Sequence, residues 1–201
     1  MKSEKQVTIF VLLVILVLAA AGAFLIINSN KGTPDEYNYN NFRVSKNPTI
    51  GYTVVAYTGQ QPYHLQLRND PRNVENITID PKIRSLILTK QEIFFTLDPD
   101  FNSIPVLGAM EMANILGRRL GLYDKRVTGT VTRQPENSEG VQVVDCDKVT
   151  EDVNVVRLQL GSETKVFLED NECIIVQGTN EWEIVRASDR LIYQLLEVIE
   201  D

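Results

Sequence analysis

The sequence contains one histidine, His64, among 201 residues, and this scarcity excludes several kinds of catalytic site. Imidazole is the commonest metal ligand and the usual base in Ser/His/Asp triads, so sites that need several histidines are ruled out. The chain also has no Gly-x-Ser-x-Gly motif, and no phosphate-cradling Gly-rich loop follows a predicted strand. We therefore predict no cofactor and no metal site, and the sequence favours binding over catalysis.

Clusters of basic residues are missing as well. The chain has 20 Lys and Arg against 27 Asp and Glu, which gives a formal net charge of −7 at pH 7. An acidic surface repels the phosphate backbone of nucleic acids, and no basic stretch carries interleaved aromatic residues. We expect no nucleic-acid partner, and the acidity indicates a well-solvated surface.

Cysteine occurs only twice, as Cys146 and Cys173, and there is no Cys-x-x-Cys motif. Asp145, Asp147 and Glu172 flank the two thiols, and neighbouring carboxylates disfavour the thiolate that a nucleophile needs. An even number of cysteines in an exported domain indicates a disulfide, which would stabilise the fold by about 3–4 kcal/mol. The alternative is a pair of buried free thiols.

Charged residues are absent from residues 7–27, which are almost entirely apolar. A helix of this length crosses a hydrocarbon core of about 30 Å. Lys2 and Lys5 precede the run, so the positive-inside rule places the N-terminus in the cytoplasm and the chain after residue 27 outside. We therefore predict a single-pass protein of the cell membrane, anchored in the lipid bilayer by residues 7–27.

Two alternatives stay open for this run. Residues 21–23 (Ala-Gly-Ala) have the small-x-small form of a signal-peptidase site, and cleavage after Ala23 would release a secreted protein. Residues 24–27 continue the apolar run past that site, which favours the anchor. A helix packed against copies of itself would instead make a filament subunit, although no processing site precedes the run.

The composition of the remaining segments predicts a tail, a stalk and one folded domain. Residues 1–6 form a cytoplasmic tail, and residues 28–48, rich in Asn, Tyr, Pro and Gly, are predicted to be a stalk. Residues 49–201 are long enough for one extracytoplasmic domain with a substantial core.

The pattern within this domain predicts an α/β fold with a mixed sheet and two principal helices. The central unit is a buried strand at 92–97, a helix at 103–120 ended by Gly121, and a strand at 126–133, which together give a parallel pairing. A hairpin at 50–67 and a short helix at 82–88 precede this unit. A short strand at 141–144, strands at 154–160, 164–169 and 173–177, and a final helix follow it.

The final helix begins at Asn180, with Glu183 three residues later in a capping-box pattern. Its apolar residues recur at helical spacing and predict a core face. Its polar residues are expected to face water: Arg186, Asp189, Arg190, Gln194 and Glu197. We likewise expect Glu111 to lie on the solvent side of the central helix, and Trp182 to pack in the core or to act as a hydrophobic staple.

Two groups of polar residues are candidates for a site. Asp98 and Asp100 follow a predicted parallel strand, where α/β sheets open their ligand crevice, and could serve a metal-assisted hydrolase. The simpler interpretation is an Asp-Pro-Asp turn that feeds the helix dipole. Arg68 and Arg72, with Asp70 between them, could clamp a carboxylate or phosphate, or could merely flank a turn. Asn76 begins an Asn-Ile-Thr glycosylation sequon.

Three segments of the outer domain carry a resemblance: RNDPR at 68–72, TLDPDF at 96–101 and CIIVQGTNEWEIVRASDRLIYQLL at 173–196. With the long apolar helix predicted after TLDPDF, they resemble uncharacterised single-pass membrane proteins of small-genome archaea. The resemblance implies a signal-anchored α/β domain and no particular reaction. We therefore expect an extracytoplasmic interaction domain whose partner is another envelope protein, with the hydrolase and the filament subunit as alternatives.

Overall fold

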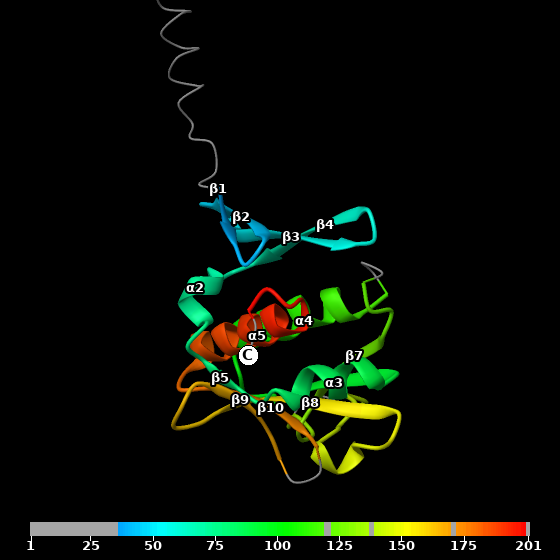
Figure 1. Cartoon of the computed structure of the whole chain (residues 1–201). Helices are drawn as coiled ribbons and strands as arrows, with labels where there is room; N and C mark the ends of the chain where they lie inside the picture. Colours follow the sequence, from blue (N-terminus) through cyan, green and yellow to red (C-terminus); the bar gives the residue numbers. More distant parts are fainter. Residues whose placement is uncertain (1–35, 119–121, 137–138, 170–171, 200–201) are drawn as a thin grey trace, which may run out of the picture. The chain divides into compact units, whose positions relative to one another are not determined.

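The computed structural model describes residues 36–118, 122–136, 139–169 and 172–199 (Figure 1). The chain divides into two compact units, Met1–Glu36 and Tyr37–Asp201, and the fold described below is that of the second. The predicted membrane segment at 7–27 lies outside the described residues. No helix among the described residues is long and apolar enough to span a bilayer.

The domain contains two sheets rather than the single mixed sheet that the sequence predicts. The first is a four-stranded sheet in the order β1 (Glu36–Tyr39), β2 (Phe42–Asn47), β3 (Gly51–Thr58), β4 (Gln61–Leu67). Strands β3 and β4 form the predicted antiparallel hairpin, and β2 pairs antiparallel with β3.

The prediction of a stalk is wrong for its second half, because β1 and β2 lie there. Their side chains alternate between exposed and buried positions, with Val44 fully buried and Tyr37, Tyr39 and Phe42 packed against the core. Asn40 and Asn41 join them in a two-residue turn with φ of 43° and 69°. Asparagine tolerates this left-handed backbone, so an Asn-rich composition here makes a hairpin rather than a linker.

The second sheet has six strands in the order β5-β9-β10-β8-β6-β7 (Figure 1). Strands β10, β8, β6 and β7 are parallel neighbours, β9 is antiparallel to β10, and β5 is parallel to β9. Their bounds are β5 Thr78–Ile79, β6 Glu92–Leu97, β7 Arg126–Val131, β8 Val153–Leu160, β9 Lys165–Leu168 and β10 Ile174–Gly178. The mixed character and the parallel β6–β7 pairing are both confirmed. The predicted strand at 141–144 is reduced to one bridge between Val131 and Val143.

Four helices accompany the sheets: α2 (Pro71–Val74), α3 (Lys82–Thr89), α4 (Ser103–Leu116) and α5 (Glu181–Leu195). Asn102 caps α4 through its side chain, and the helix ends at Leu116, before Gly117, and not at 120 as predicted. Asn180 caps α5 by accepting from the Glu183 amide at 3.1 Å. Near the middle of α4, a Cβ on Gly108 would lie 2.4 Å from Ser188 Oγ, so glycine there lets α4 and α5 approach closely.

Helix α5 lies between the two sheets (Figure 1). A single apolar core cluster joins residues of the four-stranded sheet, such as Val54 and Leu65, to residues of the six-stranded sheet, such as Val176. The expectation that the polar side of α5 faces water is therefore wrong for three residues that are almost completely buried: Asp189, Arg190 and Gln194. A second layer of the fold covers the side of α5 that its amphipathic sequence pattern assigns to solvent.

The opposite face of the six-stranded sheet carries the disulfide. Cys146 and Cys173 are bonded, as predicted, with their Cα atoms 5.4 Å apart. They belong to a small separate cluster with Val144, Val155 and Ile175. Val155 and Ile175 alternate along their strands with residues of the main core, so the cluster lies on the other face. The disulfide ties the loop that covers this face to the start of β10.

Candidate functional site

A groove runs between the four-stranded sheet and the two long helices. It consists of two cavities, of about 270 and 530 Å³, which share Thr49, Ile50 and Arg68. The smaller is completed by Gly51, Asn69, Trp182 and Arg186, and the larger by His64, Leu65, Gln66, Leu107, Met110, Glu111, Asn114 and Ile115. We call the two together the Arg68 groove.

Arg68 separates the two cavities and directs an incompletely paired guanidinium group into them. It follows β4 directly, and its Nε donates to Glu111 Oε1 at 2.9 Å. Its two terminal nitrogens have no hydrogen-bond partner within the described ranges, and 40% of its side chain is exposed. These nitrogens remain available to an anionic group in the groove.

Behind Arg68 lies a buried pair of carboxyl groups, Glu111 on α4 and Asp189 on α5. Asp189 Oδ2 accepts from the backbone and side-chain nitrogens of Asn69, both at 2.8 Å. Burial raises the pKa of both acids, and the proximity of the Asp189 charge raises that of Glu111 further. The expectation that Glu111 faces solvent is wrong, because β4 and α5 enclose the part of α4 that carries it.

The second oxygen of each carboxyl group indicates that the pair shares a proton. Glu111 Oε2 and Asp189 Oδ1 are buried and lack a partner among the protein atoms of the described residues. The two carboxyl groups interact directly. A single proton held between them would satisfy both oxygens, which unprotonated carboxylates cannot do for each other. Arg68 is thus paired with a group that carries less than a full negative charge.

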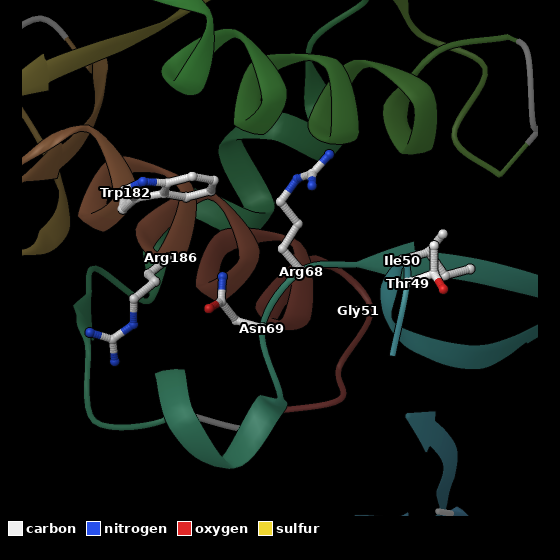
Figure 2. A pocket seen from close by; sticks show the side chains of 7 residues that line it. All are labelled: Thr49, Ile50, Gly51, Arg68, Asn69, Trp182 and Arg186. Carbon is white, nitrogen blue, oxygen red and sulfur yellow. The ribbon is translucent and has the colours of Figure 1, made fainter. Parts of the chain in front are cut away.

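Trp182 forms the far side of the smaller cavity. Its side chain is 53% exposed, so the prediction that it packs in the core is wrong. Figure 2 shows the Trp182 indole and the Arg68 guanidinium on one side of Asn69, with the Arg186 guanidinium directed to the other. Arg186 is held there by Glu183 Oε1 at 2.8 Å and the carbonyl of Asn73.

The structure gives the two arginines of the predicted clamp different acidic partners. Arg72 Nε binds Asp70 Oδ1 at 2.9 Å, and Arg72 stacks on the Tyr37 ring at 3.9 Å from its centre. Although burial opposes it, hydrogen bonds from Arg72 lower the pKa of Asp70, which also caps α2 through the Arg72 amide. Of this predicted group, Arg68 lines the groove, and Asp70 and Arg72 fix the turn that follows it.

Asp98 and Asp100 lie where the sequence places them, after the parallel strand β6 and before α4. Arg133 binds both, with its Nη2 3.1 Å from Asp98 Oδ1. A cavity of about 530 Å³ opens beside them, and Arg157 there pairs with Asp145 at 3.2 Å. No group of three or more His, Cys, Asp or Glu suited to a metal ion occurs among the described residues. The two predicted carboxylates share one arginine as their partner.

The predicted glycosylation residue, Asn76, is exposed in the turn between α2 and β5. His64 is also exposed, on β4, and contributes to the larger cavity. Sequence reasoning identified Arg68 but missed Glu111, Asp189 and Trp182. Nothing local distinguishes a buried acid or an exposed indole on an amphipathic helix, so no motif could have found these three.

Comparison of the chain with protein-family models, with curated proteins and with solved structures found no match. The functional argument therefore rests on the groove itself.

Proposed function

We propose that the protein is a membrane-anchored, extracytoplasmic binding domain whose Arg68 groove takes an acidic saccharide of the cell envelope. The observation that carries this proposal is the pairing of an exposed indole, Trp182, with the free guanidinium nitrogens of Arg68 across one cavity. The saccharide could be part of a glycosylated envelope protein or of a polymer. Both sources present the same chemistry of a sugar ring that bears a carboxylate.

The residues of the groove match this chemistry. The apolar face of a sugar ring packs on a flat indole, and a guanidinium group binds a carboxylate through two parallel hydrogen bonds. Asn69 lines the same cavity, and the oxygen of its side-chain amide has no partner within the described part of the chain. It would accept from a sugar hydroxyl. The reduced negative charge on the Glu111–Asp189 pair leaves the surroundings of Arg68 favourable to an anion.

The proposed location rests on the sequence together with the disulfide. Disulfides persist outside the reducing cytoplasm, and Cys146 is bonded to Cys173. The apolar run at 7–27 and the lysines before it supply the anchor and its orientation. Protease added to sealed membrane vesicles of known orientation tests this part separately. Digestion of residues 37–199 from the cytoplasmic side would contradict it.

The binding proposal is tested with the fluorescence of Trp182, the only tryptophan in the chain. The full-length protein in detergent micelles is titrated with trigalacturonate and, in parallel, with neutral galactotriose. We expect a saturable change in the indole emission with the acidic trisaccharide. No change with it, or an equal response to the neutral sugar, would overturn the proposal.

A matched pair of variants assigns the effect to the groove. Arg68→Gln removes the guanidinium and should weaken trigalacturonate binding by about tenfold or more, as expected for a charge-assisted hydrogen bond. Arg126→Gln is the control, because Arg126 is also an exposed arginine paired with a glutamate, Glu92, at 3.2 Å. Equal loss in both variants would show a non-specific charge effect.

The alternatives are separated by other variants. Asp98→Asn with Asp100→Asn removes the carboxylates that the hydrolase hypothesis needs. Stabilisation of the wild type by divalent ions, absent from this double variant, would favour the hydrolase. The filament hypothesis predicts concentration-dependent polymers of the full-length chain that disappear when residues 7–27 are replaced.

A further inference from the structure

Strand β7 forms one edge of the six-stranded sheet (Figure 1). Its pairing with β6 uses alternate residues: the Arg126 amide donates to Gln91 O at 3.0 Å, and the Thr132 amide to Leu97 O at 3.1 Å. In a parallel ladder the residues between them direct their amides and carbonyls the other way. Val127 and Gly129 therefore present their backbone groups to the outer side of the edge.

The two ends of this edge are already paired. At one end the Lys125 amide donates to Leu116 O at 2.9 Å. At the other, Val131 donates to Gln142 O at 3.1 Å and accepts from the Val144 amide at 3.0 Å. Between these ends, the outward amides and carbonyls of Val127 and Gly129 have no partner in the part of the chain that the structure describes.

An apolar groove of about 360 Å³ lies along this gap, between β7 and α4. Met110 and Val141, both substantially exposed, border it. The remaining lining is Phe95, Leu97, Val106, Ala109, Ala113 and residues 127–131. Among the described residues, no charged side chain lines it. The groove thus combines unpaired backbone groups with an adjoining apolar surface, which are the two features that strand addition requires.

We propose that the β7 edge binds an extended segment of a partner polypeptide whose side chains are apolar at alternate positions. The added strand would bond to Val127 and Gly129, and every second side chain would enter the groove beneath α4. Gly129 has nothing within 4 Å of the position of an added Cβ, so the face of the strand is open at this residue. The gap also lacks the lysine, proline or bulge that protects many natural edges.

The length of the gap determines the kind of occupant. Three residues, 127–129, span about 10 Å between the paired ends. A second copy of β7, with six residues, would collide with the segments bonded to Lys125 and Val131. A short linear segment fits. The bridge between Val131 and Val143 already shows that this edge accepts a parallel neighbour.

The test uses the full-length chain in detergent micelles and a fluorescein-labelled, end-capped peptide, Val-Thr-Val, whose three residues match the length of the gap. Anisotropy measures binding, and hydrogen–deuterium exchange measures protection of residues 126–131. We expect saturable binding and slower exchange in β7, and neither with a peptide in which serine replaces each valine. Absence of binding at millimolar peptide would overturn the proposal.

Two variants locate the contact. Gly129→Pro removes only an amide that faces away from β6, and should weaken peptide binding by about tenfold through the lost hydrogen bond and the intruding ring. Val141→Lys, which charges the groove at an exposed position, provides a second variant if proline impairs folding.

Three outcomes would assign the edge differently and so overturn the proposal. Unchanged binding by Gly129→Pro and by Val141→Lys would place the peptide elsewhere. Slow exchange of the Val127 and Gly129 amides before peptide is added would show that another part of this chain occupies the edge. Concentration-dependent dimers that Gly129→Pro abolishes would make the occupant a second copy. Trigalacturonate binding, measured at Trp182, should be the same in all these variants, because neither Gly129 nor Val141 lines the Arg68 groove.

Discussion

Helix α5 contacts the six-stranded sheet and the four-stranded region with different kinds of side chain. Toward the six-stranded sheet it contributes aliphatic residues to a continuous core that includes β8 and β10. Toward β4 and α2 it contributes polar ones: Asp189 accepts from Asn69, and the Tyr193 hydroxyl donates to Asn69 O at 2.6 Å. The same helix is buried by hydrophobic contact on one side and largely by hydrogen bonds on the other.

The difference matters because the two interfaces respond to different changes. The stability that apolar burial provides is insensitive to pH. A substitution in an apolar interface lowers the free energy of unfolding in proportion to the volume of side chain removed. A buried polar interface depends on every group finding its partner and on the protonation of its acids. The Arg68 groove opens beside the polar interface, so the titratable groups of the fold are adjacent to the proposed ligand.

The largest expected effect is on the apolar side. Leu191, on α5, is fully buried in the core cluster. Leu191→Ala should lower the free energy of unfolding by about 4 kcal/mol, because the cavity adds to the lost transfer free energy. Urea unfolding of the full-length chain, followed by circular dichroism, measures it. The control is Leu160→Ala, since Leu160 is 49% exposed and should change stability by less than about 1 kcal/mol.

A somewhat smaller loss is expected on the polar side. Asp189→Ala leaves both nitrogens of Asn69 without an acceptor and should lower the free energy of unfolding by about 3 kcal/mol. Asp189→Asn keeps an acceptor oxygen and should cost about 1 kcal/mol. If the two variants are equally stable, the hydrogen bonds do not hold this interface, and the contrast between the two sides of α5 is lost.

The third prediction concerns pH and applies to the polar side alone. The raised pKa of Glu111 and of Asp189 means that the folded state holds more protons than the unfolded state above the usual carboxylate range. Stability should therefore fall, by on the order of 2 kcal/mol, as the pH rises from about 5 to about 8. Glu111→Gln supplies a permanent donor to Asp189 and should flatten this dependence. Glu197→Gln, at an exposed pair with Arg84, should leave it unchanged.

How far the sequence determines these features differs between the two sides. The unit β6–α4–β7 is predictable because an apolar run, the Asn102 cap and the following strand are all local signals. The apolar side of α5 is predictable for the same reason. Its polar side is not, because an amphipathic pattern looks the same whether water or another polar layer covers it. That layer comes partly from β1 and β2, whose composition resembles a linker.

The residues of the Arg68 groove could likewise be predicted from the sequence only in part. Arg68 could be identified from the sequence as a candidate site residue, because arginines around a turn suggest anion binding. Its partner Glu111 lies 43 positions later and Trp182 more than 110 later, so only the tertiary fold brings them to one groove. The predicted end of α4 was wrong for a simpler reason. Gly117 and Gly121 are equally good stop signals in sequence, and the earlier one is used, where Val127 packs 2.9 Å from the position of an added Cβ.

The smallest expected effect is at the exposed rim of the polar side, and it separates function from folding. Trp182 lies in the first turn of α5 with about half of its side chain exposed. Trp182→Ala should therefore change the free energy of unfolding by less than about 0.5 kcal/mol, while trigalacturonate binding, measured by calorimetry, should fall at least tenfold. A large indole retained on the surface without a role in stability is best explained by a ligand. If Trp182→Ala destabilises the domain by as much as Asp189→Ala, Trp182 is a structural residue. The proposal that the Arg68 groove binds a saccharide would then lose its main support.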